Sequence, residues 1–138
     1  MIKLIVGVKG TGKTKTLIGL VNAAAAESTG AVICIECGSK LNFDITHKAR
    51  LVDTKSFNIE GGEALYGFIA GMLASNHDIT DVYVDSALKI CKNDIDEFEK
   101  FVISVNELVE GANIKCEMTV SCPAENLSEK VKKFIELH

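Results

Sequence analysis

The residues with the clearest chemical potential form one short stretch near the start of the chain. Gly7-Val8-Lys9-Gly10-Thr11-Gly12-Lys13-Thr14 fits the pattern G-x-x-x-x-G-K-(S/T) at every fixed position. Glycine-rich backbone can bring successive N–H groups close to phosphate oxygens, an approach that side chains would obstruct. Lys13 would add a positive charge for the β- and γ-phosphates, and the Thr14 hydroxyl one Mg²⁺ ligand. The stretch predicts a nucleotide-binding loop.

The segments around this stretch have the character that such a loop requires. Ile2 to Val6 is an apolar run of strand length, and Lys15 to Glu27 has the composition of a helix. A phosphate loop works between a buried strand and a helix, because the helix N-terminus also attracts anions. We expect the phosphates to contact Gly7, Lys9, Gly10, Thr11, Gly12, Lys13, Thr14 and Lys15, with Lys13 also acting in catalysis.

Two acidic residues end apolar runs elsewhere in the chain. Glu36 closes the run Val32 to Ile35, and Asp85 closes Val82 to Val84. An acid at the end of a strand near a phosphate loop often holds Mg²⁺ through its water shell, and we assign this role to Asp85. Many buried strands end in aspartate only to cap a turn. The pattern gains weight here because a complete phosphate loop accompanies it.

The elements that must position these residues alternate between strands and helices. We expect strands over residues 2–6, 31–36, 79–85 and 114–120, and helices over residues 15–27, 63–75, 94–110 and 127–137. This order predicts a single domain over residues 1–138, a three-layer α/β/α fold with a mainly parallel central sheet. In such a sheet the ligand binds at the carboxyl ends of the strands, where the loop and both acids lie.

Two regions are less regular. In Gly38 to Glu60, the pieces Phe43–Ile45 and Arg50–Val52 could form short strands, either as an edge hairpin or as a loop that faces the ligand. Gly67 and Gly71 lie on one face of the helix expected at 63–75. Because glycine is poor in helix interiors, we expect a close approach to the sheet or to another helix at these two positions.

Composition narrows the class of protein. With 47% hydrophobic residues and a net charge of −4, the chain can bury a core and lacks the basic balance typical of nucleic-acid binding. We expect no signal peptide and no membrane span, hence a cytoplasmic protein. Five cysteines suggest free thiols in a reducing compartment. Cys34 and Cys37 have C-x-x-C spacing without a second pair, which favours core packing over metal binding.

The segment Asp85-Ser86-Ala87-Leu88 resembles the RecA and KaiC group of P-loop NTPases, whose Walker B strand commonly ends in Asp-Ser. In that group the catalytic glutamate ends the strand after the first helix. The resemblance implies that Glu36 is the general base that orients water, the alternative being an exposed strand-end acid. It also implies a γ-phosphate sensor at Thr119 or Ser121. The chain is similar as well to short stand-alone bacterial ATP-binding P-loop proteins, sometimes grouped with twitching-motility ATPases.

Together these features predict an ATP-binding protein that acts as a Mg²⁺-dependent ATPase, with ATP and ADP as partners. A small-molecule or nucleotide kinase, and a regulatory switch that hardly hydrolyses ATP, stay open as alternatives. The guanine motif N-K-x-D is missing. Arg50 is the only arginine, so we expect slow turnover unless a homo-oligomer supplies a positive charge to its neighbour. The sequence names no protein partner and no biological task.

Overall fold

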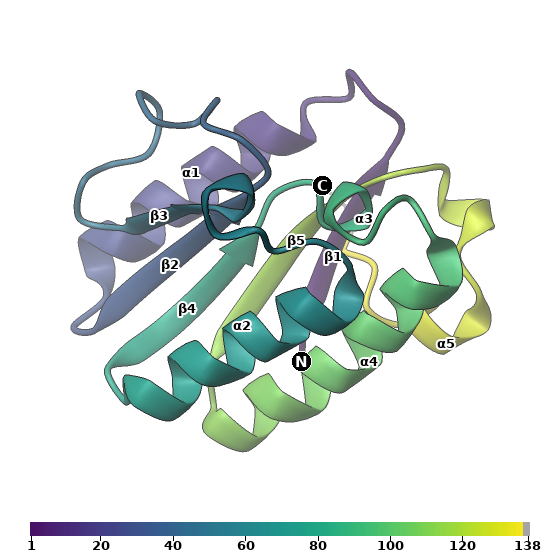
Figure 1. The fold of residues 1–138 in the computed structure, drawn as a ribbon. Helices are drawn as coiled ribbons and strands as arrows, with labels where there is room; N and C mark the ends of the chain where they lie inside the picture. Colours follow the sequence, from purple (N-terminus) through teal and green to yellow (C-terminus); the bar gives the residue numbers. More distant parts are fainter. Residues whose placement is uncertain (137–138) are drawn as a thin grey trace.

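The computed structural model describes residues 1–136, which fold around a sheet of five parallel strands (Figure 1). The strands are β1 (Lys3–Gly7), β2 (Ala31–Glu36), β3 (Arg50–Asp53), β4 (Ile79–Val84) and β5 (Lys115–Ser121). Their order across the sheet is β1-β5-β4-β2-β3. All four core strands expected from the sequence are confirmed. Because every strand runs the same way, their carboxyl ends lie along one edge of the sheet.

Helices cover both faces of the sheet. They are α1 (Lys13–Glu27), α2 (Gly62–Ser75), α3 (Ala87–Ile90), α4 (Ile95–Ala112) and α5 (Glu129–Lys132), with two 3₁₀ turns, η1 (Thr54–Phe57) and η2 (Ala124–Asn126). The helix α1 packs on one face, whereas α2 and α4 lie side by side on the other (Figure 1). The expected α/β layering with a parallel sheet is therefore observed.

The apolar runs of the strands are continuous because the side chains of each strand pack into a hydrophobic core on either face of the sheet. In β2, Val32 and Cys34 pack on the side of α1, and Ile33 and Ile35 pack on the side of α2 and α4. Burial on both faces removes the alternation of polar and apolar residues seen in half-exposed strands. The residues at the strand ends therefore lie at the edge of a sheet that is packed on both faces.

The irregular region after β2 contains one strand and not two. Residues 43–45 form turns, so the strand considered for Phe43–Ile45 is absent, and Phe43 is fully exposed. Only Arg50–Asp53 pairs with the sheet, and it runs parallel to β2, with Asp53 opposite Glu36. An edge hairpin is excluded, because its two strands would be antiparallel. Residues 38–49 instead cross from one parallel strand to the next.

The helix expected over 127–137 is also wrong. Only Glu129–Lys132 is helical, and Leu137 lies outside the described residues. The N–H of Leu4 donates to the carbonyl of Phe134 (2.8 Å), and the N–H of Glu136 donates to the carbonyl of Leu4 (2.8 Å). The chain leaves the helix because β1 is an edge strand whose backbone groups gain these partners.

The close approach expected at Gly67 and Gly71 is not found. Both residues are exposed, and a Cβ atom added at either would meet nothing within 4 Å. The tight crossing between α2 and α4 lies at Gly62 instead, where an added Cβ would come within 3.2 Å of the Glu97 carbonyl oxygen. Glycine therefore permits close helix packing at the start of α2, and has no such role on the exposed face of that helix.

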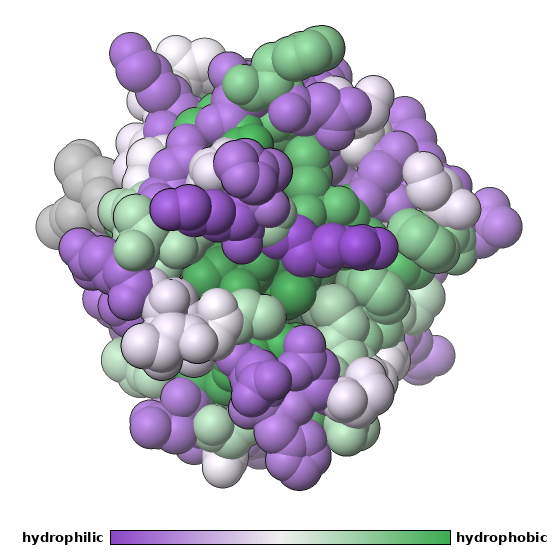
Figure 2. All heavy atoms as spheres, turned by 90° about the vertical axis from the view of Figure 1, so that its left-hand side faces the viewer, coloured by the Kyte–Doolittle hydropathy of each residue, from purple (hydrophilic) through white to green (hydrophobic). Residues whose placement is uncertain are grey.

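The surface on the side of β3 is mixed in character. Figure 2 shows hydrophobic residues (green) in the middle of this face with hydrophilic residues (purple) around them. Phe57, in the η1 turn that follows β3, is 60% exposed. No helix within residues 1–136 combines the length and the apolar composition needed to cross a membrane.

Candidate functional site

The glycine-rich loop connects the end of β1 to the first residue of α1, as expected from its sequence. Gly10 and Gly12 have φ angles of 83° and 84°, a left-handed conformation that side-chain-bearing residues rarely adopt. A Cβ atom on Gly7 would lie 2.9 Å from the Thr11 hydroxyl oxygen. The backbone conformation therefore favours glycine at positions 10 and 12, and a side chain at position 7 would displace the Thr11 hydroxyl.

Lys13 lies within the loop and not in solvent. Its Nζ donates a hydrogen bond to the carbonyl oxygen of Val8 (2.9 Å), and the residue is only 8% exposed. The Thr11 hydroxyl donates to the same carbonyl (2.8 Å). Burial lowers the pKa of Lys13, and the nearby negative charge of Asp85 opposes that shift. The ammonium group is thus held beside the loop backbone.

The two predicted metal ligands meet directly. The Thr14 hydroxyl donates to Asp85 Oδ1 over 3.1 Å, although the two residues come from α1 and the end of β4. The Thr119 hydroxyl donates to the same Oδ1 (2.8 Å) and accepts the N–H of Ser86 (2.7 Å). Asp85 is 9% exposed. The strand β5, which lies between β1 and β4, therefore fixes the orientation of this carboxylate.

The backbone after Asp85 turns sharply. Ser86 has a φ angle of 59°, so a residue with a side chain adopts the left-handed region at the end of β4. The N–H of Asp85 donates to the carbonyl of Ile35 (2.8 Å), which continues the ladder to β2. Such a strained conformation persists where the surrounding contacts hold it in place. Here it directs the chain into α3, beside the glycine-rich loop.

Glu36 is a buried acid and not an exposed strand-end residue. It is 3% exposed, and its Oε2 accepts the N–H of Leu41 (3.2 Å). Burial raises the pKa of Glu36, whereas the backbone N–H groups of Leu41 and Lys40 act in the opposite direction. The carboxylate borders the same cavity as Lys13 and Asp85.

One cavity of about 310 Å³ collects most of the predicted residues at the carboxyl edge of the sheet. It is lined by Lys9, Gly10, Gly12, Lys13, Thr14, Lys15, Glu36 and Asp85, together with Cys37, Lys40, Leu41, Ser86, Lys89 and Ser121. Gly7 and Thr11, also predicted as contacts, are not among the lining residues and act on the shape of the loop. We call this space the loop cavity.

Sequence reasoning missed two lysines of the loop cavity. Lys40 follows β2, and Lys89 belongs to the short helix α3. With Lys9, Lys13 and Lys15 they place five of the chain's 15 Lys and Arg residues around one space, in a protein of net charge −4. No local pattern marks either residue, because their position depends on how the turns after β2 and β4 fold back.

Some candidate residues lie elsewhere or take another role. Arg50 is exposed at the start of β3 and does not line the loop cavity. Thr119 is 1% exposed and is bound to Asp85, so Ser121 is the residue of this pair that borders the cavity. Cys34 and Cys37 are free thiols, and no group of three potential metal-ligating His, Cys, Asp or Glu side chains is found within residues 1–136.

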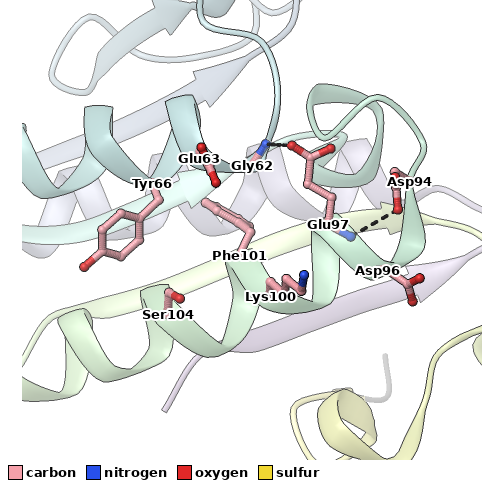
Figure 3. A pocket seen from close by; sticks show the side chains of 9 residues that line it. All are labelled: Gly62, Glu63, Tyr66, Asp94, Asp96, Glu97, Lys100, Phe101 and Ser104. Carbon is pink, nitrogen blue, oxygen red and sulfur yellow. Dashed lines mark hydrogen bonds between the residues drawn. The ribbon is translucent and has the colours of Figure 1, made fainter.

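A larger cavity of about 540 Å³ has the opposite chemistry. It lies between α2 and α4 and is lined by Tyr66, Phe101 and Ser104, by the acids Glu63, Asp94, Asp96 and Glu97, and by Lys100 and Gly62 (Figure 3). Glu97 accepts the N–H of Gly62 (2.8 Å), and Asp94 accepts the N–H of Glu97 (3.1 Å). Four carboxylates against one lysine make the lining of this cavity acidic, which disfavours phosphate as a ligand there.

Comparison with known proteins gives no family assignment: no family model and no curated protein matches this sequence. The fold defines the class of protein as a small α/β domain with an all-parallel, five-stranded sheet flanked by helices. Any finer statement depends on the chemistry of the loop cavity.

Proposed function

We propose that this protein binds ATP in the loop cavity and hydrolyses it as a Mg²⁺-dependent ATPase of the RecA-like P-loop type. The observation that carries the proposal is the 3.1 Å contact between the Thr14 hydroxyl and Asp85 Oδ1, at the start of α1 and beside the glycine-rich loop. A phosphate loop and a metal-holding acid must meet in this way for nucleotide chemistry. The two residues lie 71 positions apart in the sequence and are brought together at the carboxyl edge of the sheet.

The charge of the loop cavity supports phosphate as the ligand. The helix α1 is 15 residues long, its N-cap Gly12 offers no side-chain cap, and its first turn contains no acid. Its free N–H groups therefore point a partial positive charge toward the loop. The five lysines around the cavity add full charges, so the site attracts a polyanion such as a nucleoside triphosphate.

The donor atoms also suit Mg²⁺. This ion prefers oxygen ligands, takes few of them from the protein, and keeps several waters and phosphate oxygens. A threonine hydroxyl and one aspartate carboxylate match that preference, and both border the loop cavity. When bound with the nucleotide, Mg²⁺ would neutralise charge that develops on the phosphate oxygens. Thr119 keeps the carboxylate of Asp85 in position for this task.

Glu36 would accept a proton from, or orient, the attacking water. Its burial keeps it out of bulk solvent, and it borders the same cavity as Lys13. No arginine lines the loop cavity, and Arg50 lies outside it. An arginine that stabilises the transition state contributes about 10³–10⁵-fold in related chemistry. We therefore expect slow turnover by the isolated chain.

The test is ATP binding and phosphate release with matched variants. We expect Mg²⁺-dependent release by the wild type, and at least about tenfold weaker ATP binding for Lys13→Ala, because a charged hydrogen-bonding partner is lost. Lys48→Ala is the control, since Lys48 is an exposed lysine outside the loop cavity. Glu36→Gln should bind ATP normally and release phosphate about 10²-fold more slowly or worse.

The results of these measurements distinguish the proposed ATPase from the alternatives. Unchanged ATP affinity in Lys13→Ala would refute the nucleotide site itself. Unchanged release by Glu36→Gln would remove Glu36 as the base and leave the site intact. Tight Mg²⁺-ATP binding without release at any protein concentration would point to a regulatory switch.

A small-molecule kinase is a second candidate, favoured by one observation. Another cavity shares Cys37 and Lys89 with the loop cavity. A kinase needs such an adjoining space for the acceptor, whereas an ATPase needs only water. ATP consumption that requires an added metabolite would favour this candidate.

A further inference from the structure

A second cavity, of about 370 Å³, adjoins the loop cavity near the carboxyl ends of β2 and β3. Cys37 and Lys89 line both spaces. The remaining walls come from the η1 turn, the segment that follows it, and the end of α3, and consist of Thr54, Lys55, Asn58, Ile59, Glu60 and Ile90. We call this space the side cavity. Its volume suits a small metabolite and not a macromolecule.

The walls of the side cavity are fixed by hydrogen bonds. Asp53 Oδ1 accepts the N–H of Gly38 (2.7 Å) and the N–H of Lys55 (2.9 Å), so one carboxylate joins the turn after β2 to the η1 turn. The N–H of Ile59 donates to the carbonyl of Thr54 (3.0 Å). The N–H of Gly61 donates to the carbonyl of Ile90 (2.9 Å), which ties the segment to α3. The cavity is therefore preorganised and not a gap between loose loops.

Thr54 gives the side cavity a polar floor. This residue is 1% exposed, yet it lines the cavity, and its hydroxyl makes no hydrogen bond within the described part of the chain. Asn58, with a φ angle of 54°, adds an amide to the same wall. The cavity thus offers a hydroxyl and a carboxamide to a ligand.

The charged groups define the kind of ligand. Lys55 and Lys89 border the side cavity against the single acid Glu60, so the lining is net positive. A threonine hydroxyl, a carboxamide and two ammonium groups form a donor-rich set that suits an anionic oxygen group. Ile59 and Ile90 provide apolar walls for a short carbon skeleton.

We propose that the side cavity binds a small anionic metabolite, carrying a carboxylate or a phosphate, next to the nucleotide phosphates. Thr54, Lys55 and Asn58 hold its anionic group, and Lys89 faces both ligands. The position of this ligand relative to the phosphates rests on the proposed nucleotide site, whereas the side cavity itself does not. Specificity for the metabolite therefore comes from the irregular segment between β2 and α2, and not from the phosphate loop.

The experiment uses the full chain saturated with Mg²⁺ and ADP, so that the added anions do not simply occupy the phosphate loop. Malonate serves as the carboxylate probe and glycerol 3-phosphate as the phosphate probe, and amide NMR shifts follow each titration. We expect saturable shifts at residues 54–60. Thr54→Val and Lys55→Gln should each weaken the better probe about tenfold, because each loses a hydrogen bond to a charged group. Lys48→Gln, an exposed lysine outside both cavities, should leave the affinity unchanged.

Each outcome has one meaning. The absence of shifts at residues 54–60 with both probes overturns the proposal, as does wild-type affinity in both Thr54→Val and Lys55→Gln. Lys55 is exposed, so Lys55→Gln remains informative if Thr54→Val unfolds. Failure of ADP to bind at all refutes the nucleotide site instead, and the same titration without ADP then reports on the side cavity alone.

Discussion

Glu36 combines burial with a raised pKa, and the sign of that shift gives a stability prediction. A carboxyl group whose pKa is higher in the folded state stabilises the fold while it is protonated, and this contribution is lost as the pH rises through the folded pKa. The unfolded reference for glutamate is about 4.3. At any pH above its folded pKa, Glu36 is an ionised group in the fold that would be better solvated in the unfolded chain.

We expect Glu36→Gln to be more stable than the wild type at neutral pH, because glutamine keeps an acceptor for the Leu41 N–H without the buried charge. The difference in the free energy of unfolding should shrink as the pH falls through the raised pKa of Glu36 in the folded state, and should be lost once the pH is below the unfolded value of about 4.3. Urea unfolding at several pH values measures it. A difference that is independent of pH would show that ionisation of Glu36 does not change the free energy of unfolding.

Thr119 is a positioning residue for Asp85, and its substitution should weaken the binding of Mg²⁺ more than the binding of the nucleotide. Thr119→Val removes the hydroxyl that donates to Asp85 Oδ1 (2.8 Å). We expect the Mg²⁺ concentration needed for ADP binding to rise about tenfold, since a hydrogen bond to a charged group is lost. Calorimetric Mg²⁺ titration in the presence of ADP checks this. Thr119→Ser should restore the wild-type value, whereas loss of stability alone would not respond to the added hydroxyl in this way.

At the scale of elements, glycines with opposite surroundings provide a matched test. A Cβ atom on Gly30, in the turn between α1 and β2, would clash with the backbone carbonyl oxygen of Asp78. Gly30→Ala should destabilise the fold by about 1–3 kcal/mol, as overpacking does. Gly67→Ala and Gly71→Ala should each stabilise it by roughly 0.5–1 kcal/mol, because these helix positions are open. Thermal unfolding of the three variants measures the contrast, and equal effects would contradict the packing described here.

Elements defined by local pattern could be predicted from the sequence. The apolar runs of β1, β2, β4 and β5, and the helical periodicity of α4, need no knowledge of distant partners. Residues 134–136 are different, because they pair with β1 at the opposite end of the chain. Their apolar spacing also fits a helix, and only the open edge of β1 decides against it.

The candidate site divides in the same way. Gly7–Thr14 and Asp85 have a signature in their own neighbourhood, so the motif and the parallel topology are sufficient to bring them together. Lys40, Lys89 and Thr54 have none. Their place at a cavity depends on the turns after β2, β3 and β4, whose course is set by contacts such as Asp53 with Gly38. Irregular segments that form cavity walls are the part that local patterns do not predict.

At the scale of the whole molecule, charge is unevenly distributed. The chain has a net charge of −4, yet five lysines surround the loop cavity. We expect Lys40→Gln and Lys89→Gln each to weaken ATP binding a few-fold at low salt, and less at high salt, because the Debye length falls from about 30 Å at 0.01 M to about 8 Å at 0.15 M. Dissociation constants at two ionic strengths test this. An effect that is independent of salt would indicate lost packing instead of lost charge.

The pairing of β1 with β5 joins the first and the last strand within residues 1–136, with Lys3 opposite Glu117 and Gly7 opposite Ser121. A ribosome that has already made the glycine-rich loop must still synthesise most of the protein before β5 exists. At roughly 5–20 residues per second this is a wait of several seconds. During that time the nascent chain has its glycine-rich loop but not the Thr119 hydroxyl that orients Asp85. We expect nucleotide capture, as proposed above, to begin only once β5 has been synthesised, so a product truncated before β5 would carry the glycine-rich loop without the Thr119 contact to Asp85.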